Sequence, residues 1–181
     1  MKKKPQQIDE TLCIVPFGVV KGDQVDKVCA GIIEQIPLKC HVMPPELMPK
    51  QAYDTTRKQY NSTLLLNLIK DMDAPSQRIM GITEFDLFCG KQNYVFGEAD
   101  PTMGVAVFSL LRLRQEYYGL MPDEKRFLSR SITEGVHATG HIFGLRHCSD
   151  PYCVMFNSPS LVDMDQKRFE FCSRCSGLLP R

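Results

Sequence analysis

The stretch EGVHATGHIFGLRH, residues 134–147, decides the fold and the chemistry expected of this chain. His137 and His141 are four residues apart, so a helix places both imidazoles on one face, one turn from each other. Gly144 can end that helix, because glycine accepts the left-handed conformation that a helix C-terminus often needs. His147 follows three residues later, where the turning chain can bring it back. The stretch therefore predicts three histidines gathered at the end of one helix.

Three neutral imidazoles at this spacing suit one divalent ion. Zinc binds histidine nitrogen at about 2.0–2.1 Å, and three histidine ligands leave a fourth position open for water, as in catalytic sites. The alternative is a set of unrelated polar or core histidines. Three of the chain's 4 histidines lie within residues 137–147, which favours the metal interpretation. His41, the fourth, falls in a separate predicted strand and is expected to be a structural histidine.

Four of the chain's 8 cysteines follow this stretch directly, as CSDPYCVM (148–155) and CSRC (172–175). Four thiolates bind zinc in closed, structural sites at about 2.3 Å, and two close pairs separated by a loop are the usual spacing. The alternatives are four free thiols, or two disulfides in an oxidising compartment. The expected ligands of this structural zinc are Cys148, Cys153, Cys172 and Cys175. Because Cys148 adjoins His147, loss of the structural zinc should also loosen the histidine site.

The other cysteines are scattered among apolar neighbours. Free cysteine usually behaves as a small hydrophobic residue, so we expect them to be buried in the core. They are Cys13, Cys29, Cys40 and Cys89.

The bulk composition indicates one soluble globular domain. The chain has 181 residues, of which 43% are hydrophobic, and 22 basic residues balance 21 acidic ones. A net charge of +1 gives no electrostatic reason for a nucleic-acid or membrane partner. No apolar run approaches the roughly 20 residues needed to span a bilayer. The N-terminal MKKKPQQIDE has no apolar stretch behind it, so we expect a cytoplasmic protein, and a monomer is favoured.

Hydrophobic periodicity predicts an α/β domain. The expected elements are strands at 11–20, 39–43, 78–87, 94–98 and 105–113, and helices at 23–35, 53–72 and from Pro122–Asp123 to Gly144. Helices between the early strands imply crossover connections and a mainly parallel sheet. The strand at 94–98 could lie antiparallel at an edge. Beyond Gly144 the chain is expected to be irregular.

The segment from His137 to Cys175 resembles the archaemetzincins, a family of zinc metalloproteases in the metzincin clan. Their signature joins HExxHxxGxxH to an immediate cysteine, then C-x4-C-x-M, then C-x-x-C. This segment matches it position by position except at Ala138. Weaker similarity extends upstream to NYVFGEAD (93–100) and VAVFSLLRL (105–113).

The resemblance implies one compact α/β domain over residues 1–181, with a twisted mixed sheet and about three helices. Its sheet and helix part would cover about 1–144, and its C-terminal zinc-binding part about 145–181. Two zinc ions would be bound, one by the three histidines and one by the four cysteines. Met155 would lie in a tight turn beneath the histidine-bound zinc. A peptide or protein substrate would lie antiparallel to an edge strand, with aminopeptidase-like cleavage suggested for some members.

Ala138 departs from the family pattern at the position of the general base. The family's glutamate takes a proton from the attacking water and later protonates the leaving amine. A methyl group can do neither, so we expect an inactive or much weakened peptidase. Glu134, one turn earlier, is expected to be an outer partner of the site or a solvated charge rather than a base. Ala138 fits equally a natural pseudoenzyme and an active protease inactivated by substitution.

Three functions are therefore open. The first is a zinc peptidase in an inactivated form, and the second is a natural protein that captures peptides without cutting them. In the third, both zinc sites are structural, which requires a fourth protein ligand at the histidines.

Overall fold

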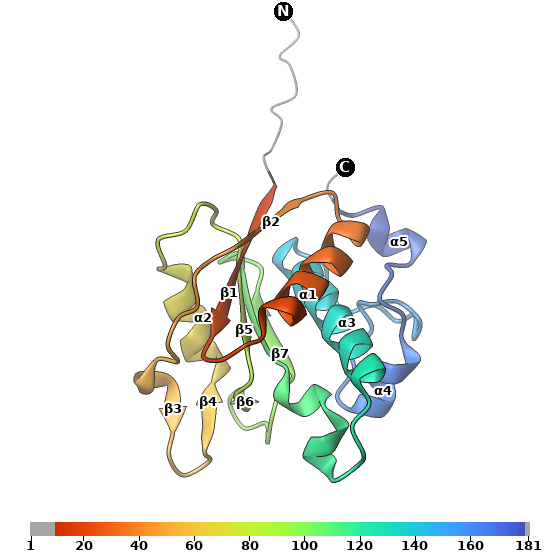
Figure 1. Ribbon diagram of the computed structural model, residues 1–181. Coiled ribbons are helices and arrows are strands. Elements are labelled where there is room, and N and C mark those ends of the chain that lie inside the picture. Colours follow the sequence, from red (N-terminus) through yellow and green to blue (C-terminus); the bar gives the residue numbers. More distant parts are fainter. Residues whose placement is uncertain (1–9, 180–181) are drawn as a thin grey trace, which may run out of the picture.

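The computed structural model describes residues 10–179, which form three layers (Figure 1). In chain order the elements are β1 (Thr11–Phe17), α1 (Gly22–Gln35), β2 (Lys39–Val42), η1 (Lys50–Ala52), β3 (Tyr53–Asp54), β4 (Gln59–Asn61), α2 (Ser62–Lys70), β5 (Ile79–Thr83), β6 (Leu87–Phe88), β7 (Gly97–Asp100), β8 (Val105–Ser109), η2 (Leu111–Leu113), η3 (Gln115–Tyr118), α3 (Glu124–Ile142), α4 (Leu161–Gln166) and α5 (Ser173–Ser176). The expected domain also includes residues 1–9 and 180–181, which lie outside the described residues. Its division near residue 144 stays a prediction.

The main sheet has five strands in the order β2-β1-β5-β8-β7. All neighbouring pairs are parallel except β7 with β8, so β7 is an antiparallel edge strand. A small second sheet joins β3, β4 and β6. The predicted α/β fold with a mixed sheet is confirmed, and so is the antiparallel edge.

Alternation along β1 explains why helices cover both faces of the sheet. Leu12 and Ile14 point into one hydrophobic core together with residues of α1 and α3. Cys13 and Val15 point into the other core, which contains residues of α2. Because successive side chains of a strand face opposite sides, an apolar run such as β1 needs cover on both.

The helix expected at 53–72 is wrong over its first nine residues. The Asp54 carboxylate accepts the backbone N–H groups of Thr56 and Arg57 at 2.9 Å each, which makes a tight turn between β3 and β4. Asn61 then caps α2 by accepting the N–H of Leu64 at 3.1 Å. Local turn chemistry therefore outweighs the helical spacing of the apolar residues.

Three other strand boundaries differ from those expected. The strand at 78–87 divides into β5 and β6, and the strand at 105–113 ends at Ser109 before a 3-10 turn. The strand expected at 94–98 lies instead at 97–100, because its register is set by pairing with β8. Beyond Gly144 two short helices, α4 and α5, interrupt the irregular chain, and no strand longer than an isolated bridge occurs among residues 145–179.

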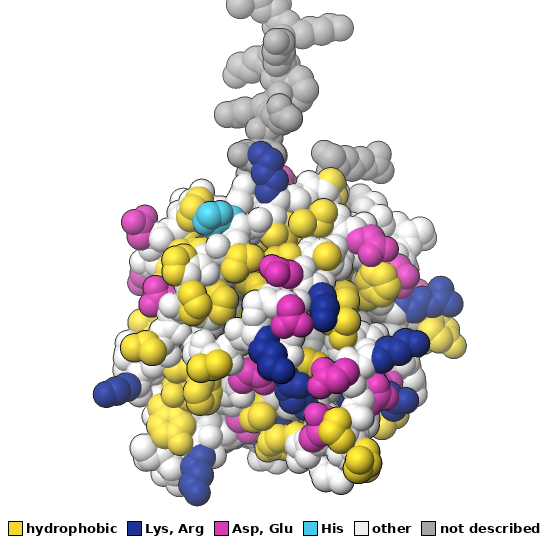
Figure 2. All heavy atoms as spheres, viewed as in Figure 1, with side chains coloured by type: hydrophobic (Ala, Val, Ile, Leu, Met, Phe, Trp, Pro, Cys, Tyr) yellow, Lys and Arg dark blue, Asp and Glu magenta, His cyan; other side chains and the backbone are white. Residues whose placement is uncertain are grey.

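The surface carries mixed charge. Figure 2 shows basic and acidic side chains interspersed on one face of the molecule, in line with the balanced composition. Within residues 10–179, none of the helices has the length and apolar character to cross a membrane.

Candidate metal centre

A capping side chain defines the start of helix α3, and a glycine in the left-handed conformation defines its end. The Asp123 carboxylate accepts the N–H of Arg126 at 2.9 Å, and Glu124 in the first turn suits the helix dipole. After the last turn Gly144 adopts a left-handed φ of 84°, as predicted. Close packing on α1 depends on Gly135, where a Cβ would lie 2.5 Å from Val28 Cγ1. The two ends of α3 and its packing on α1 therefore fix the position of the histidines near its C-terminus.

The structure brings together the three histidines that the sequence predicts. One ring nitrogen from each of His137, His141 and His147 lies within 4.8 Å of the others. The Nε2 atoms of His137 and His141 are 3.1 Å apart. Among residues 10–179, no fourth histidine, cysteine or acidic side chain joins this group.

Backbone carbonyls determine which ring nitrogen of His137 and of His141 is free. The Nδ1–H of His137 donates to the Val154 carbonyl at 2.8 Å, and that of His141 donates to the Leu145 carbonyl at 2.8 Å. Both Nε2 atoms are then unprotonated, and their lone pairs face a common point. This is the outer arrangement that orients histidine ligands of zinc, so the residues present fit a zinc ion.

Burial also keeps the three imidazoles neutral. It lowers the pKa of His137 well below its ordinary value, and the charge of Lys167 lowers it further. Burial lowers the pKa of His141 and of His147 in the same direction. Neutral imidazole is the form that binds a metal ion.

The four predicted thiols also converge. Their sulfur atoms lie within 4.8 Å of one another, with 3.9 Å between Cys148 Sγ and Cys172 Sγ. The Asp150 N–H and the Arg174 guanidinium donate to Cys148 Sγ at 3.4 and 3.1 Å. Burial opposes ionisation of Cys148, but these donors, together with hydrogen bonds from Cys175 and Cys172, outweigh it and lower its pKa to about 7. A close group of four sulfurs suits a soft, tetrahedral ion such as zinc.

A short backbone segment connects the two groups. Val154, which orients His137, follows Cys153 directly, and the Cys148 N–H donates to the Met155 carbonyl at 2.9 Å. Met155 is fully buried beneath α3, where its Sδ would lie 2.4 Å from a Cβ on Gly140. Met155 thus packs against α3 beside Gly140, the neighbour of His141, and its role in a turn beneath the metal stays a prediction.

A cleft of about 540 Å³ opens on the histidine side. Ala138 lines it with 5% of its surface exposed, four residues after Glu134 on the same helical face. The opposite wall is the edge strand β7 and the residues just before it. The methyl group of Ala138 leaves this position of the cleft without a proton-transferring side chain.

Glu134 is not a solvated charge, so that part of the expectation is wrong. Only 6% of its surface is exposed, and burial raises the pKa of its carboxyl, an effect that the nearby charge of Lys167 partly offsets. Lys167 was not predicted from the sequence, yet it lines the same cleft. Its ammonium donates to the Phe156 carbonyl at 3.2 Å, and burial lowers its pKa. No motif marks Lys167, because only the folded chain brings it to α3.

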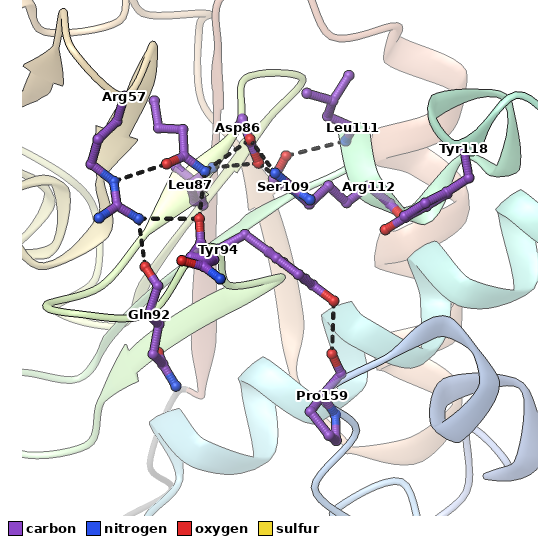
Figure 3. A network of polar contacts seen from close by, with 12 residues as sticks. Arg57, Asp86, Leu87, Gln92, Tyr94, Ser109, Leu111, Arg112, Tyr118 and Pro159 are labelled. Atoms are coloured by element: carbon purple, nitrogen blue, oxygen red, sulfur yellow. Dashed lines mark hydrogen bonds and ion pairs between the residues drawn. The ribbon is translucent and has the colours of Figure 1, made fainter.

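A polar network supports the wall of the cleft (Figure 3). Arg112 donates two hydrogen bonds to the Asp86 carboxylate, at 2.6 and 2.7 Å, and its guanidinium lies 4.1 Å from the centre of the Tyr94 ring. The Tyr94 hydroxyl donates to the Pro159 carbonyl at 2.9 Å, which links two segments that line the cleft. Arg57 donates to the Asn93 carbonyl at 3.1 Å, on the same loop. The loop before β7 is therefore held at both sides.

The residues expected to be structural lie away from this centre. Cys13 and Cys29 are buried as predicted, whereas Cys40 and Cys89 are only half-buried. His41 is exposed on β2, an edge strand, rather than enclosed.

Comparison with known proteins gives matches over most of the chain. The family model for peptidase family M54 matches residues 25–181. An archaemetzincin from Methanocaldococcus jannaschii is 37% identical over 164 residues, covering 91% of this chain and 89% of that protein. One from Pyrococcus furiosus is 36% identical over 173 residues, covering 92% and 90%.

Solved structures agree. The crystal structure of archaemetzincin from Methanopyrus kandleri is similar with a TM-score of 0.81 at 33% identity, covering 96% of this chain and 95% of that one. A zinc-dependent peptidase from Methanocorpusculum labreanum is similar with a TM-score of 0.81 at 27% identity, covering 93% and 100%.

Proposed function

Because this chain belongs to peptidase family M54, the archaemetzincins, we propose that it holds a catalytic zinc ion on His137, His141 and His147. The family is one of zinc-dependent metallopeptidases, so the class of reaction is peptide-bond hydrolysis. The observation that carries the proposal is the pair of histidine Nε2 atoms 3.1 Å apart with their Nδ1 protons already donated. Two facing lone pairs repel each other unless a cation is shared between them. A second, structural zinc on the four cysteines completes the proposed cofactors.

When bound, zinc polarises a peptide carbonyl and activates water. Residues of this chain would position the peptide substrate. Among residues 10–179, β7 pairs with β8 and with no strand on its other side, so that edge can hold an extended peptide by main-chain hydrogen bonds. The proposed partner is therefore a peptide or protein substrate. Aminopeptidase-like specificity would appear as a preference for free over acetylated N-termini.

Turnover by this chain should be much weakened. Ala138 stands in the cleft where a general base would act, and general acid–base catalysis contributes typically 10²–10⁴-fold to rate. Glu134 is the nearest carboxylate along the same helical face, but its carboxyl lies against β7 rather than at the position of Ala138.

Restoring the base tests this proposal. Ala138→Glu should raise kcat/KM on a broad peptide panel by about 10²–10⁴-fold, and a chelator should abolish the gain. Ala30→Glu, on the exposed face of α1, is the matched control and should change nothing. A zinc-loaded Ala138→Glu protein that cleaves no peptide better than the parent would contradict a peptidase role.

Ala138 itself favours one other function, a natural peptide-binding protein that does not cut. That function predicts peptide binding by the parent chain and no gain in turnover from Ala138→Glu. The same experiment therefore separates the two. The cytoplasmic location and the monomeric state of this protein remain predictions from the sequence.

A further inference from the structure

The proposed mechanism leaves two buried charges in the cleft without a role. Glu134 and Lys167 are each 6% exposed, and both line the cleft beside the histidines. The Glu134 carboxylate lies beneath the edge strand β7, where its Oε1 is 3.0 Å from the place of a Cβ on Gly97. Any larger residue at position 97 would crowd this carboxylate, so the glycine lets it approach the strand.

Neither group has all of its hydrogen-bonding positions filled by residues 10–179. No residue among 10–179 donates a hydrogen bond to the Glu134 carboxylate, and no ion pair within 4.0 Å joins it to Lys167. The Lys167 ammonium has three donors but finds one protein acceptor, the Phe156 carbonyl at 3.2 Å. Its other near contact, His137 Nδ1 at 3.5 Å, already donates to Val154. The polar atoms of both groups are not among the fully buried, unpaired ones and face the open cleft, where polar groups of a ligand can replace water.

The two groups also adjoin the proposed metal site. Lys167 lies 3.5 Å from His137, and Glu134 is one helical turn before it. A substrate side chain next to the histidines could therefore reach both groups from the cleft. We call this space, lined by Glu134, Lys167 and Gly97, the charged recess.

We propose that the charged recess selects a carboxamide side chain, as in glutamine, in the bound peptide; this inference rests on the proposed function. The amide NH2 would donate to the Glu134 carboxylate, and the amide oxygen would accept from the Lys167 ammonium. A neutral carboxamide satisfies both groups without disturbing the balance of their charges.

Other side chains leave part of the recess unsatisfied. An aliphatic side chain would exclude water while pairing with neither group, and such a mismatch is strongly rejected by sites built to hydrogen-bond. A glutamate side chain would pair with Lys167 but oppose Glu134, and a lysine side chain would do the reverse. Selection therefore works by both attraction and repulsion.

Binding by the zinc-loaded chain, which keeps Ala138, tests the recess without relying on turnover. Four peptide hydroxamates would be compared, identical except that the side chain next to the hydroxamate is that of Gln, Glu, Lys or Leu. The hydroxamate anchors each compound at the metal, and calorimetry gives Kd. We expect the Gln compound to bind about tenfold or more tightly than each of the others.

Two variants should then switch the preference. Glu134→Gln leaves Lys167 as the single charge and should favour the Glu compound by about tenfold, whereas Lys167→Met should favour the Lys compound. Glu124→Gln, in the exposed first turn of α3, is the control and should keep the parent order. Glu134→Gln is isosteric and carries the test if Lys167→Met does not fold.

The outcomes separate the recess from the proposed function. If all four compounds bind within threefold of one another, or if Glu134→Gln keeps the parent order, the recess is overturned while the metal site stands. If no hydroxamate binds to zinc-loaded protein, the proposed function fails and the recess fails with it.

Discussion

Replacing Cys153 by serine should weaken zinc binding at the three histidines, although Cys153 belongs to the other cluster. The next residue, Val154, accepts the Nδ1–H of His137 at 2.8 Å. The carbonyl of Met155, the residue after Val154, accepts the N–H of Cys148 at 2.9 Å. The backbone that orients a histidine is therefore anchored by the sulfur cluster.

The size of the effect follows from that hydrogen bond. Loss of an outer partner of a metal-binding histidine typically costs 10–100-fold in metal affinity. That range corresponds to about 1.4–2.7 kcal/mol. We therefore expect the affinity of the histidine site in Cys153→Ser to fall by about 10–100-fold, because serine is a poor replacement for a thiolate ligand.

Competition with a chromophoric chelator measures this affinity. The histidine zinc would be followed separately, as the difference between each protein and its His141→Ala derivative. Cys89→Ser is the matched control, since Cys89 is half-buried and lies outside the cluster. Near-ultraviolet circular dichroism checks that the domain core remains folded. An unchanged affinity in folded Cys153→Ser protein would refute the coupling of the two sites.

Zinc affinity at the histidines should stay level from pH 8 to about 6.5 and fall only below that pH. The pKa of each histidine is lowered, so protons compete with zinc for the ring nitrogens only in more acidic solution. A decline that begins well above pH 6.5 in the chelator assay would contradict this. In metal-free protein the free energy of unfolding should decrease as pH falls below about 6.5, since the unfolded histidines bind protons that the folded ones refuse. Urea titrations with an opposite slope would disprove it. Gly140→Ala should lower the free energy of unfolding by about 1–3 kcal/mol, because its Cβ would meet Met155 Sδ at 2.4 Å. Gly22→Ala, with open space around it, is the control, and equal midpoints for the two variants would count against the packing argument.

The metal-type residues were predictable because their spacing is local. His137 and His141 are one turn apart in any helix, and Gly144 ends α3 as its conformation requires. The paired cysteines needed only a loop between them to meet. The buried strand β1 was also predicted from its apolar run and the helix α1 from apolar residues at helical spacing, both close to their observed bounds.

The remaining features depend on contacts between distant segments. The hairpin at 53–61 follows from the Asp54 turn, which outweighs the apolar spacing that suggested a helix. The position of β7 follows from its register against β8. Burial of Glu134 follows from its packing beneath β7 and burial of Lys167 from the packing of the C-terminal segment against α3, and no short sequence pattern reports such packing.

Metal content per chain is the most direct test of the central claim. Protein purified with ample zinc would be analysed by native mass spectrometry, alone and as His141→Ala and Cys175→Ser variants. Two ligand groups predict two zinc ions in the parent and one in His141→Ala, with the cysteine-bound ion retained. Parent protein that holds no zinc removable by His141→Ala would contradict the account.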